Sequence, residues 1–282
     1  MLALVMALCL AQIGDARNLL YAAATDGTAT LAGVPVRLDP PTLRDDMTAG
    51  QQRAALVAVA GSKGKADDLL RDSVSAGHVL KIKDLHTTGP TIVRGVDLWF
   101  AVRADLDAID PADALGKARG GKPVEAGNMR FDARELTAVE VKDLDLKPPA
   151  GAQQWFLKTD GRLLDRIGFG STDRLLATRG EGSRLIASST LGGLVVEGTP
   201  LAGTWKDVSR PTDAPKPYAG GMGYAKLSAL KGYPGVVLVE SHAAFSEPRG
   251  WFDGAPILRS KIGLVAQDQV RSLRRELANP KR

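Results

Sequence analysis

The stretch Tyr218-Ala-Gly-Gly-Met-Gly-Tyr224, with the residues that follow it, decides the expected fold of this chain. A Gly/Pro turn at Gly232-Tyr-Pro-Gly235 comes next, and the apolar, β-branched run Val236 to Phe245 is typical of a buried strand. Glu247-Pro-Arg-Gly-Trp-Phe252 breaks that pattern, and an amphipathic helix is predicted from Asp253 to about Leu277. The chain is therefore expected to end in a hairpin, an aromatic turn and one long closing helix.

The predicted closing helix has one apolar face and one polar face. Asp253 is expected to cap its N-terminus, and the arginines of its last turns are expected to complement the helix dipole. A helix of this length must lie along a whole sheet or cover a cavity. At ~100° per residue, the two faces are Leu258, Ile262, Val265, Ala266, Val270, Leu273 and Leu277 against Gln267, Asp268, Arg271, Arg274 and Arg275.

Two polar residues, Arg259 and Gln269, fall near the apolar face of this helix. Either their stems lie on the apolar stripe while their polar ends reach water, or they point into a cavity and orient the polar end of a ligand. In the second case Trp251 and Phe252 are expected at the mouth of the cavity. Its walls are then formed by Val237, Val239, Ala243, Phe245, Leu258, Ile262 and Val265.

The rest of the chain carries further helix and strand signals. Thr48-Ala-Gly-Gln51 resembles a capping box ahead of a helix that reaches about Ala60. Helices at the start, an antiparallel sheet through the middle and one long helix last predict an α+β fold. The other predicted helices are 65–75 and 110–118, and the other predicted strands are 79–85, 96–103, 134–146, 153–159, 163–169, 174–179 and 183–191.

The order of Gly223-Tyr-Ala-Lys-Leu227, the run Val236 to Phe245, the turn Glu247-Pro-Arg-Gly-Trp-Phe252 and the terminal helix resembles the end of START-like domains of the helix-grip superfamily. The resemblance is limited to this C-terminal part of the chain. It implies a curved antiparallel sheet packed on the long C-terminal helix, here with extra N-terminal helices. It also implies an internal cavity for a lipid or another apolar ligand.

The first residues resemble a signal peptide. The run from Leu2 to Ala11 is apolar but too short to span a bilayer, and Gly14-Asp-Ala16 offers small residues for cleavage after Ala16. No Lys or Arg precedes the run, which is atypical. The sequence predicts a signal peptide at 1–16 and a single α+β domain at 17–282, with a helical subregion at 39–77, in a protein exported to the periplasm or beyond the cell.

Composition argues against several classes of function. The net charge is +5, but basic and acidic residues are interspersed, so no nucleic-acid surface is expected. Weak contact with an anionic membrane surface remains open. Cys9 is the only cysteine, so a chain cleaved after Ala16 has no disulfide and no thiolate site. The three histidines show no metal-ligand spacing, and neither a metal nor a cofactor is expected.

Three functions fit these observations. The first is an exported binding protein that holds a lipid or apolar small molecule between the sheet and the closing helix. The second is a non-catalytic structural or interaction protein of the cell envelope with a packed core. The third is a hydrolase that uses Glu240 and His242, which share one strand face. Because no Gly-x-Ser-x-Gly elbow occurs, no catalytic residue is assigned, and this pair is expected to lie exposed on the sheet.

Overall fold

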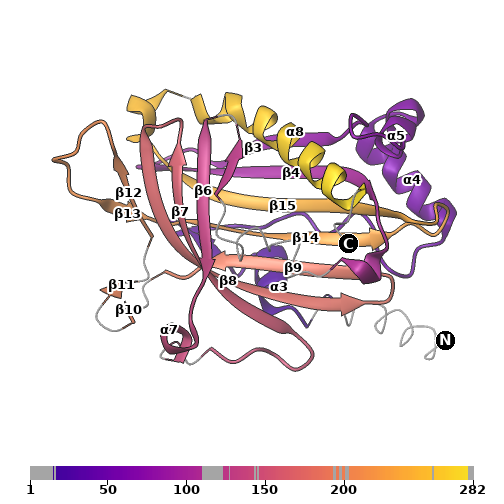
Figure 1. Cartoon of the computed structure of the whole chain (residues 1–282), viewed down its shortest axis with the longest axis horizontal. Coiled ribbons are helices and arrows are strands. Elements are labelled where there is room, and N and C mark those ends of the chain that lie inside the picture. Colours follow the sequence, from indigo (N-terminus) through magenta and orange to yellow (C-terminus); the bar gives the residue numbers. More distant parts are fainter. Residues whose placement is uncertain are drawn as a thin grey trace.

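The computed structural model describes residues 15, 17–109, 123–126, 128–142, 144, 146–192, 195–196, 199–200, 203–255 and 257–278. At its centre is an 11-stranded antiparallel sheet in the order β3-β4-β15-β14-β9-β8-β7-β6-β5, with β12 paired to β8 and β13 paired to β12 (Figure 1). Its strands are β3 (Val79–His86), β4 (Thr91–Arg103), β5 (Val124–Ala126), β6 (Met129–Glu135), β7 (Gln153–Leu163), β8 (Ile167–Gly180), β9 (Ser183–Thr190), β12 (Gly203–Asp207), β13 (Lys216–Tyr218), β14 (Gly221–Ala229) and β15 (Val236–Pro248).

The remaining elements are helices and two small hairpins. The hairpins pair β1 with β2 and β10 with β11. The bounds of these elements are α3 (Leu19–Asp26), α4 (Ala49–Ala60), α5 (Lys63–Leu69), α7 (Ala138–Lys142), α8 (Ile257–Ala278), the 3₁₀ turns η1 (Leu106–Ala108) and η2 (Trp251–Gly254), β1 (Thr30–Leu31), β2 (Val34–Pro35), β10 (Val195–Val196) and β11 (Thr199–Pro200).

The sheet curls around α8, the long helix at the C-terminus (Figure 1). The strands at the two ends of the sheet, β3 and β5, both contact this one helix, and so does β4. Leu258, Ala266 and Val270 are the buried residues of its apolar stripe. The predicted α+β class, a curved antiparallel sheet packed on a long C-terminal helix with extra N-terminal helices, is therefore confirmed.

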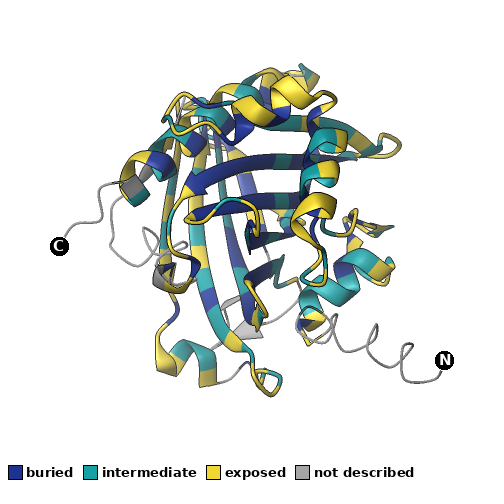
Figure 2. Cartoon of the chain, turned by 90° about the vertical axis from the view of Figure 1, so that its right-hand side faces the viewer, coloured by how far each residue is buried: buried dark blue, intermediate teal, exposed yellow. Residues whose placement is uncertain are grey.

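The N-terminal elements cover the opposite face of the sheet. Helix α3 contacts β8, β9 and β14, while α4 and α5 pack their buried leucines against β4 and β15. The predicted capping box at the start of α4 is present, with Thr48 and Gln51 bonded to each other's backbone. Figure 2 shows the buried strands between the partly exposed helices of the two faces. The sheet thus separates two distinct interiors.

The side chains of β15 alternate between these two interiors. Val237 and Val239 pack in the cluster that includes Val270 of α8. Leu238 packs with α4 and α5, and Ala244 packs in the cluster that includes Ala24 of α3. Since neighbouring residues of a strand point to opposite faces, one strand supplies the wall of a cavity on one side and a polar network on the other.

The prediction of a strand over residues 134–146 is wrong. Strand β6 ends at Glu135, and the next element is the short helix α7. A reciprocal capping pair starts this helix, because the Thr137 N–H donates to the Glu140 carboxylate at 2.8 Å and the Glu140 N–H donates to Thr137 Oγ1 at 3.3 Å. The sequence Thr137-Ala-Val-Glu140 carries that capping box, a helix-start signal that the alternating pattern obscured.

The prediction of separate strands at 163–169 and 174–179 is also wrong. Residues Leu164 and Asp165 have φ values of 50° and 55° and form the turn between β7 and β8. From Ile167 to Gly180, β8 is one continuous strand, which pairs first with β12 and then with β9. This continuity places residues 169, 171, 173 and 175 on one face of the sheet.

The start of the closing helix differs from the prediction as well. Asp253 has a φ of 55° and belongs to the turn η2, so it does not cap α8. Its carboxylate lies 2.7 Å from Arg166 Nη2 and 3.1 Å from Arg210 Nη2. The turn is therefore tied to the β7–β8 turn and to the loop after β12.

Two predicted segments lie outside the described residues, and one predicted helix ends earlier than expected. The helix predicted at 110–118 and the signal peptide at 1–16, except Asp15, lie outside them. The helix predicted at 65–75 is the shorter α5, which ends at Leu69. Within the described part of the chain, no helix has the length and apolar character needed to cross a membrane.

Candidate ligand cavity

A cavity of about 800 Å³ lies between the α8 side of the sheet and the C-terminal end of α8. Its walls come from β8, β9, β14 and β15, and Leu273 and Leu277 of α8 close it from the other side. Its volume falls in the usual range for sites that bind small molecules, about 300–1,000 Å³. Most of its lining is aliphatic or aromatic, and among the described residues it includes Leu175, Ile186, Leu227, Val239, Ala243 and Phe245.

A smaller cavity of about 280 Å³ lies towards the N-terminal end of α8. It shares three aromatic wall residues with the larger cavity, Phe169, Tyr218 and Phe245. Leu258, Ile262, Val265 and Ala266 of the helix form the opposite wall. Apart from the Tyr218 hydroxyl and the Trp251 indole nitrogen, the described side chains that line it are apolar.

The larger cavity also contains a small group of polar side chains. Asp173 of β8 accepts hydrogen bonds from Thr190 Oγ1 at 2.5 Å and from Ser171 Oγ at 3.1 Å. Burial raises the pKa of the Asp173 carboxyl, and the two hydroxyl donors oppose that rise. Burial also raises the pKa of the Tyr218 hydroxyl, and the nearby Asp173 adds to the rise. These residues form a polar region in a mostly apolar lining, whose other polar side chains include Thr159, Ser188, Ser241 and Glu276.

The sequence did not identify this polar region. A strand break was expected near Gly170, so Asp173 was not assigned to any face. The usable signal was the alternation of Ile167, Phe169, Ser171, Asp173 and Leu175 along one face of a continuous strand.

The predicted site residues are placed as follows. Phe245 lines both cavities, and Ile262 and Trp251 line the smaller one. Phe252 is buried in the adjoining aromatic cluster, so neither it nor Trp251 lies at an open mouth. Arg259 is exposed and its guanidinium lies 2.9 Å from the Asp84 carboxylate; Gln269 is also exposed. Arg259 and Gln269 therefore reach water and do not line either cavity.

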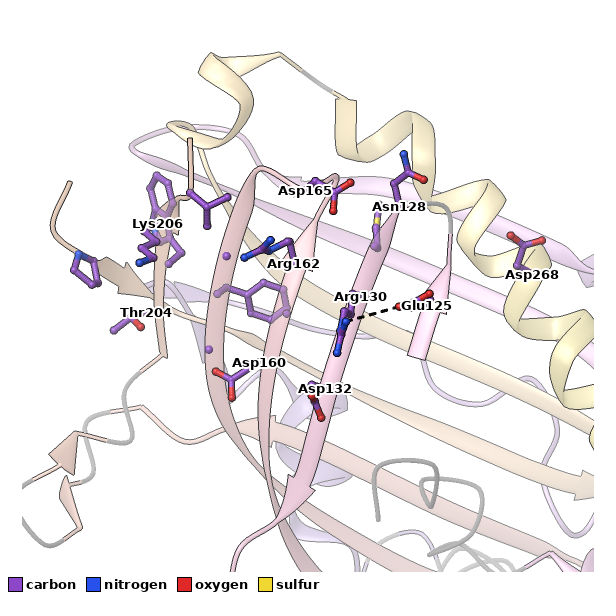
Figure 3. Close-up of a pocket in the computed structure, with 18 residues that line it drawn as sticks. Glu125, Asn128, Arg130, Asp132, Asp160, Arg162, Asp165, Thr204, Lys206 and Asp268 are labelled. Carbon is purple, nitrogen blue, oxygen red and sulfur yellow. Dashed lines mark ion pairs between the residues drawn. The ribbon is translucent and has the colours of Figure 1, made fainter. Parts of the chain in front are cut away.

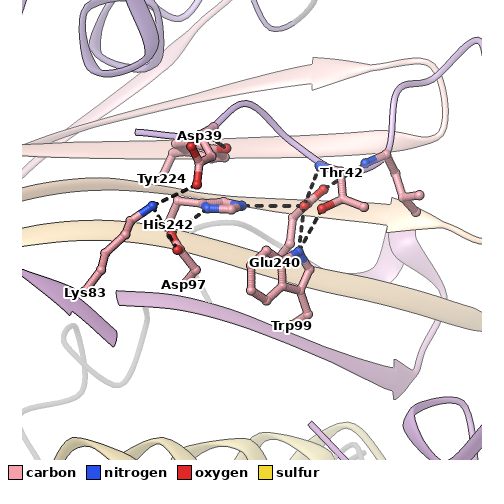
Figure 4. Close-up of polar contacts among 9 residues, drawn as sticks. Asp39, Thr42, Lys83, Asp97, Trp99, Tyr224, Glu240 and His242 are labelled. Atoms are coloured by element: carbon pink, nitrogen blue, oxygen red, sulfur yellow. Dashed lines mark hydrogen bonds and ion pairs between the residues drawn. The ribbon is translucent and has the colours of Figure 1, made fainter. Parts of the chain in front are cut away.

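On the opposite face of the sheet, Glu240 and His242 lie in a buried polar network (Figure 4). Glu240 is 0% exposed and accepts hydrogen bonds from the N–H groups of Thr42 at 2.7 Å and Leu43 at 3.3 Å, and from Trp99 Nε1 at 3.1 Å. The expectation that this pair is exposed is wrong, because residues 39–45 cover it. Neither side chain lines either cavity, so the geometry does not favour a hydrolase here.

His242 lies between two carboxylates in this network. Its Nδ1 is 2.9 Å from Asp97 Oδ1, and its Nε2 is 3.6 Å from Glu240 Oε2. Burial lowers the pKa of His242, but the hydrogen bond to Asp97 and the charge of Glu240 outweigh that effect and raise the pKa to about 9. A pKa of about 9 predicts that the buried imidazole is protonated at neutral pH.

The charge of His242 predicts a pH-dependent stability. Because the pKa rises from 6.5 to about 9 on folding, its stabilising contribution is complete below pH 6.5 and is lost as pH rises through about 9. The contribution is on the order of 3 kcal/mol. Urea unfolding from pH 6 to pH 10 should show this loss in the wild type, while His242→Gln should lack it. Equal pH dependence in both proteins would contradict a charged His242.

A third hollow, of about 970 Å³, is lined by residues of β5, β6, β7, β8, β12 and α8 (Figure 3). Its charged residues carry both signs, and one ion pair, Arg130 Nη1 to Glu125 Oε1 at 4.0 Å, joins two of them. A lining of this kind suits water or a polar solute. No cluster of three or more His, Cys, Asp or Glu side chains that could hold a metal occurs among the described residues.

Comparison with known proteins gives matches only among solved structures. No family model and no curated protein sequence matches the chain. The human StarD13 lipid transfer and protein localization domain is 12% identical, with a TM-score of 0.37, and the match covers 71% of this chain and 89% of that one. Human STARD10 is 9% identical, with a TM-score of 0.34, covering 71% and 74%. A protein from Rhizobium leguminosarum is 12% identical, with a TM-score of 0.27, covering 65% and 98%.

At TM-scores below 0.5 these likenesses carry no weight for the ligand or the function of this chain. What the chain can bind follows from its own cavity.

Proposed function

We propose that this protein binds a lipid or another apolar small molecule in the cavity between the sheet and α8. The observation that carries the proposal is the cavity of about 800 Å³, with mostly aliphatic and aromatic walls and a polar region around Asp173. A cavity lined in this way gains free energy by removing the apolar surface of a ligand from water. The adjoining cavity of about 280 Å³ offers further apolar volume for the same molecule. In this scheme Phe245, Ile262 and Trp251 contact the ligand.

Native mass spectrometry of the protein, purified without detergent, tests this function directly. We expect an extra mass in stoichiometric amount that disappears on denaturation. A protein that carries no extra mass, even after incubation with a lipid extract, would favour the alternative of a structural or interaction protein of the cell envelope.

Replacing Ala243 by tryptophan is expected to abolish binding while the protein stays folded. Ala243 lines the larger cavity, so the new indole takes volume that a ligand needs. We expect the bound mass to be lost and the affinity for added ligand to fall at least tenfold. If protein side chains already filled this volume, no bound mass would be present to lose, and the same change would destabilise the fold by about 1–3 kcal/mol.

The matched control is Leu264→Trp on α8. Leu264 is 51% exposed and lines neither cavity. This variant introduces the same side chain and is expected to keep the bound mass. Equal loss of ligand in both variants would mean that the effect does not arise in the cavity.

We also propose that the chain is exported after removal of residues 1–16, and that its net positive charge, +5 for the full chain and one unit higher without Asp15, gives weak attraction to an anionic membrane surface. The apolar run from Leu2 to Ala11 and the small residues Gly14 and Ala16 support the export proposal. The mass spectrum that reports the ligand also reports the start of the mature chain. A mass that begins at Arg17 supports export, and an intact N-terminus contradicts it. Cleavage would remove Asp15 from Lys226 and leave Asp45, 3.2 Å from Lys226 Nζ, as its ion-pair partner.

A further inference from the structure

The polar region of the larger cavity has a fixed direction of hydrogen bonding. The Gly221 N–H donates to Thr190 Oγ1 at 3.0 Å, and the Thr190 hydroxyl donates its own proton to Asp173 Oδ1 at 2.5 Å. Ser171 donates to the other carboxylate oxygen. Each carboxylate oxygen can accept more than one hydrogen bond. Asp173 therefore keeps acceptor capacity for a ligand after its protein donors are in place.

Within the part of the chain that the structure describes, the charged residues that line the cavity have one sign. The described residues that line it include Asp173 and Glu276 but no Lys, Arg or His. An anionic ligand group would lose its hydration there, would meet no positive charge from the described lining and would lie near a carboxylate. A positively charged or neutral donor would instead replace its lost water contacts with Asp173. The lining thus discriminates between ligands that have the same apolar tail.

We propose, as an extension of the proposed binding function, that the cavity selects amphiphiles whose polar end donates hydrogen bonds and carries no negative charge, with Asp173 as the acceptor. The ligand class is a long-chain amine or alcohol, and a fatty acid is rejected. The polar end lies at Asp173, and the tail extends past Tyr218 and Phe245 towards the smaller cavity that these residues also line.

The net positive charge of the protein opposes this preference for a cationic ligand. A measured preference for the amine is therefore a stringent test. With a net charge of +5, long-range attraction favours a carboxylate over an ammonium ion. A measured preference for the amine must therefore come from the cavity itself.

The test compares dodecylamine, dodecanol and dodecanoate at pH 7.5, below their aggregation concentrations, by titration calorimetry and native mass spectrometry. We expect the amine to bind the wild type at least tenfold more tightly than the acid, with the alcohol between them. Asp173→Asn keeps the shape of the side chain and an acceptor for Thr190. In this variant the amine should lose at least tenfold in affinity and the acid should gain, so that the two converge.

Glu276→Gln provides the control, because it removes the other acidic group of the lining. The preference for the amine should change less than twofold in this variant. If all three probes bind the wild type equally, or if Asp173→Asn leaves the order unchanged, the inference about ligand class is overturned and the cavity remains a binding site. If no probe binds, the proposed function fails as well. The wild-type comparison decides the question even where a variant does not fold.

Discussion

Replacing Glu240 by alanine is expected to lower the free energy of unfolding by about 3–5 kcal/mol. The carboxylate is fully buried and accepts hydrogen bonds from the backbone of Thr42 and Leu43 and from the Trp99 indole. Its removal leaves three donors without this acceptor and leaves His242 with Asp97 as its nearest carboxylate. Urea unfolding at pH 7, followed by tryptophan fluorescence and by circular dichroism, measures the change.

The control for this prediction is Glu181→Ala. Glu181 is an exposed residue of the turn between β8 and β9, and its loss should change the free energy of unfolding by less than about 0.5 kcal/mol. Hydrogen exchange adds a local readout, because residues 39–43 should lose protection in Glu240→Ala before the sheet does. A loss below about 1 kcal/mol would show that Glu240 does not hold this segment on the sheet.

The sequence predicted the closing helix and the strands that flank it because their apolar residues repeat with the period of the element. Leu258, Ala266 and Val270 recur on one helix face, and all three are buried. Val236 to Val239 and Ala243 to Phe245 are the apolar parts of the next strand, which lies in the interior of the sheet between β4 and β14. Periodicity reports which face is buried, and burial of apolar surface is the dominant stabilising term.

The polar residues were predicted less well, because a pattern does not show the partner that makes burial of a polar side chain favourable. Glu240 and His242 are two apart and were placed correctly on one face, but that face is covered by residues 39–45. The donors to Glu240 include two backbone N–H groups, which no side-chain pattern reveals. Asp173 was missed for a related reason, because glycines interrupt the alternation of β8 without ending the strand.

Arg274 of α8 is another polar residue whose burial the sequence pattern did not predict. Its position indicates the polar side of α8, yet its side chain is buried, and burial lowers the pKa of its guanidinium. The long side chain reaches from the helix to a neighbouring strand and to the loop before β3. An arginine has five N–H donors, so carbonyl oxygens can hold it in the interior.

Replacing Arg274 by methionine should therefore destabilise the docking of the C-terminal part of α8. Arg274 donates to the carbonyl oxygens of Ala101 at 2.9 Å, Ala76 at 2.5 Å and Gly77 at 2.8 Å. Methionine has a stem of similar apolar character but no donor, and it also lacks the guanidinium whose carbon lies 6.0 Å from the centroid of the Phe100 ring. We expect a loss of about 3 kcal/mol in the free energy of unfolding and faster hydrogen exchange in the last turns of α8.

The same substitution should affect ligand release, because Leu273 and Leu277 beside Arg274 line the cavity. A helix end that opens more often lets the ligand leave sooner, so the dissociation rate should rise at least tenfold while the free energy of unfolding falls. Arg275→Met is the matched control, since Arg275 is exposed in the last turn and its loss should cost less than about 1 kcal/mol. If ligand release is equally fast in both variants, the C-terminal end of α8 does not close the cavity, and the ligand must leave by another route.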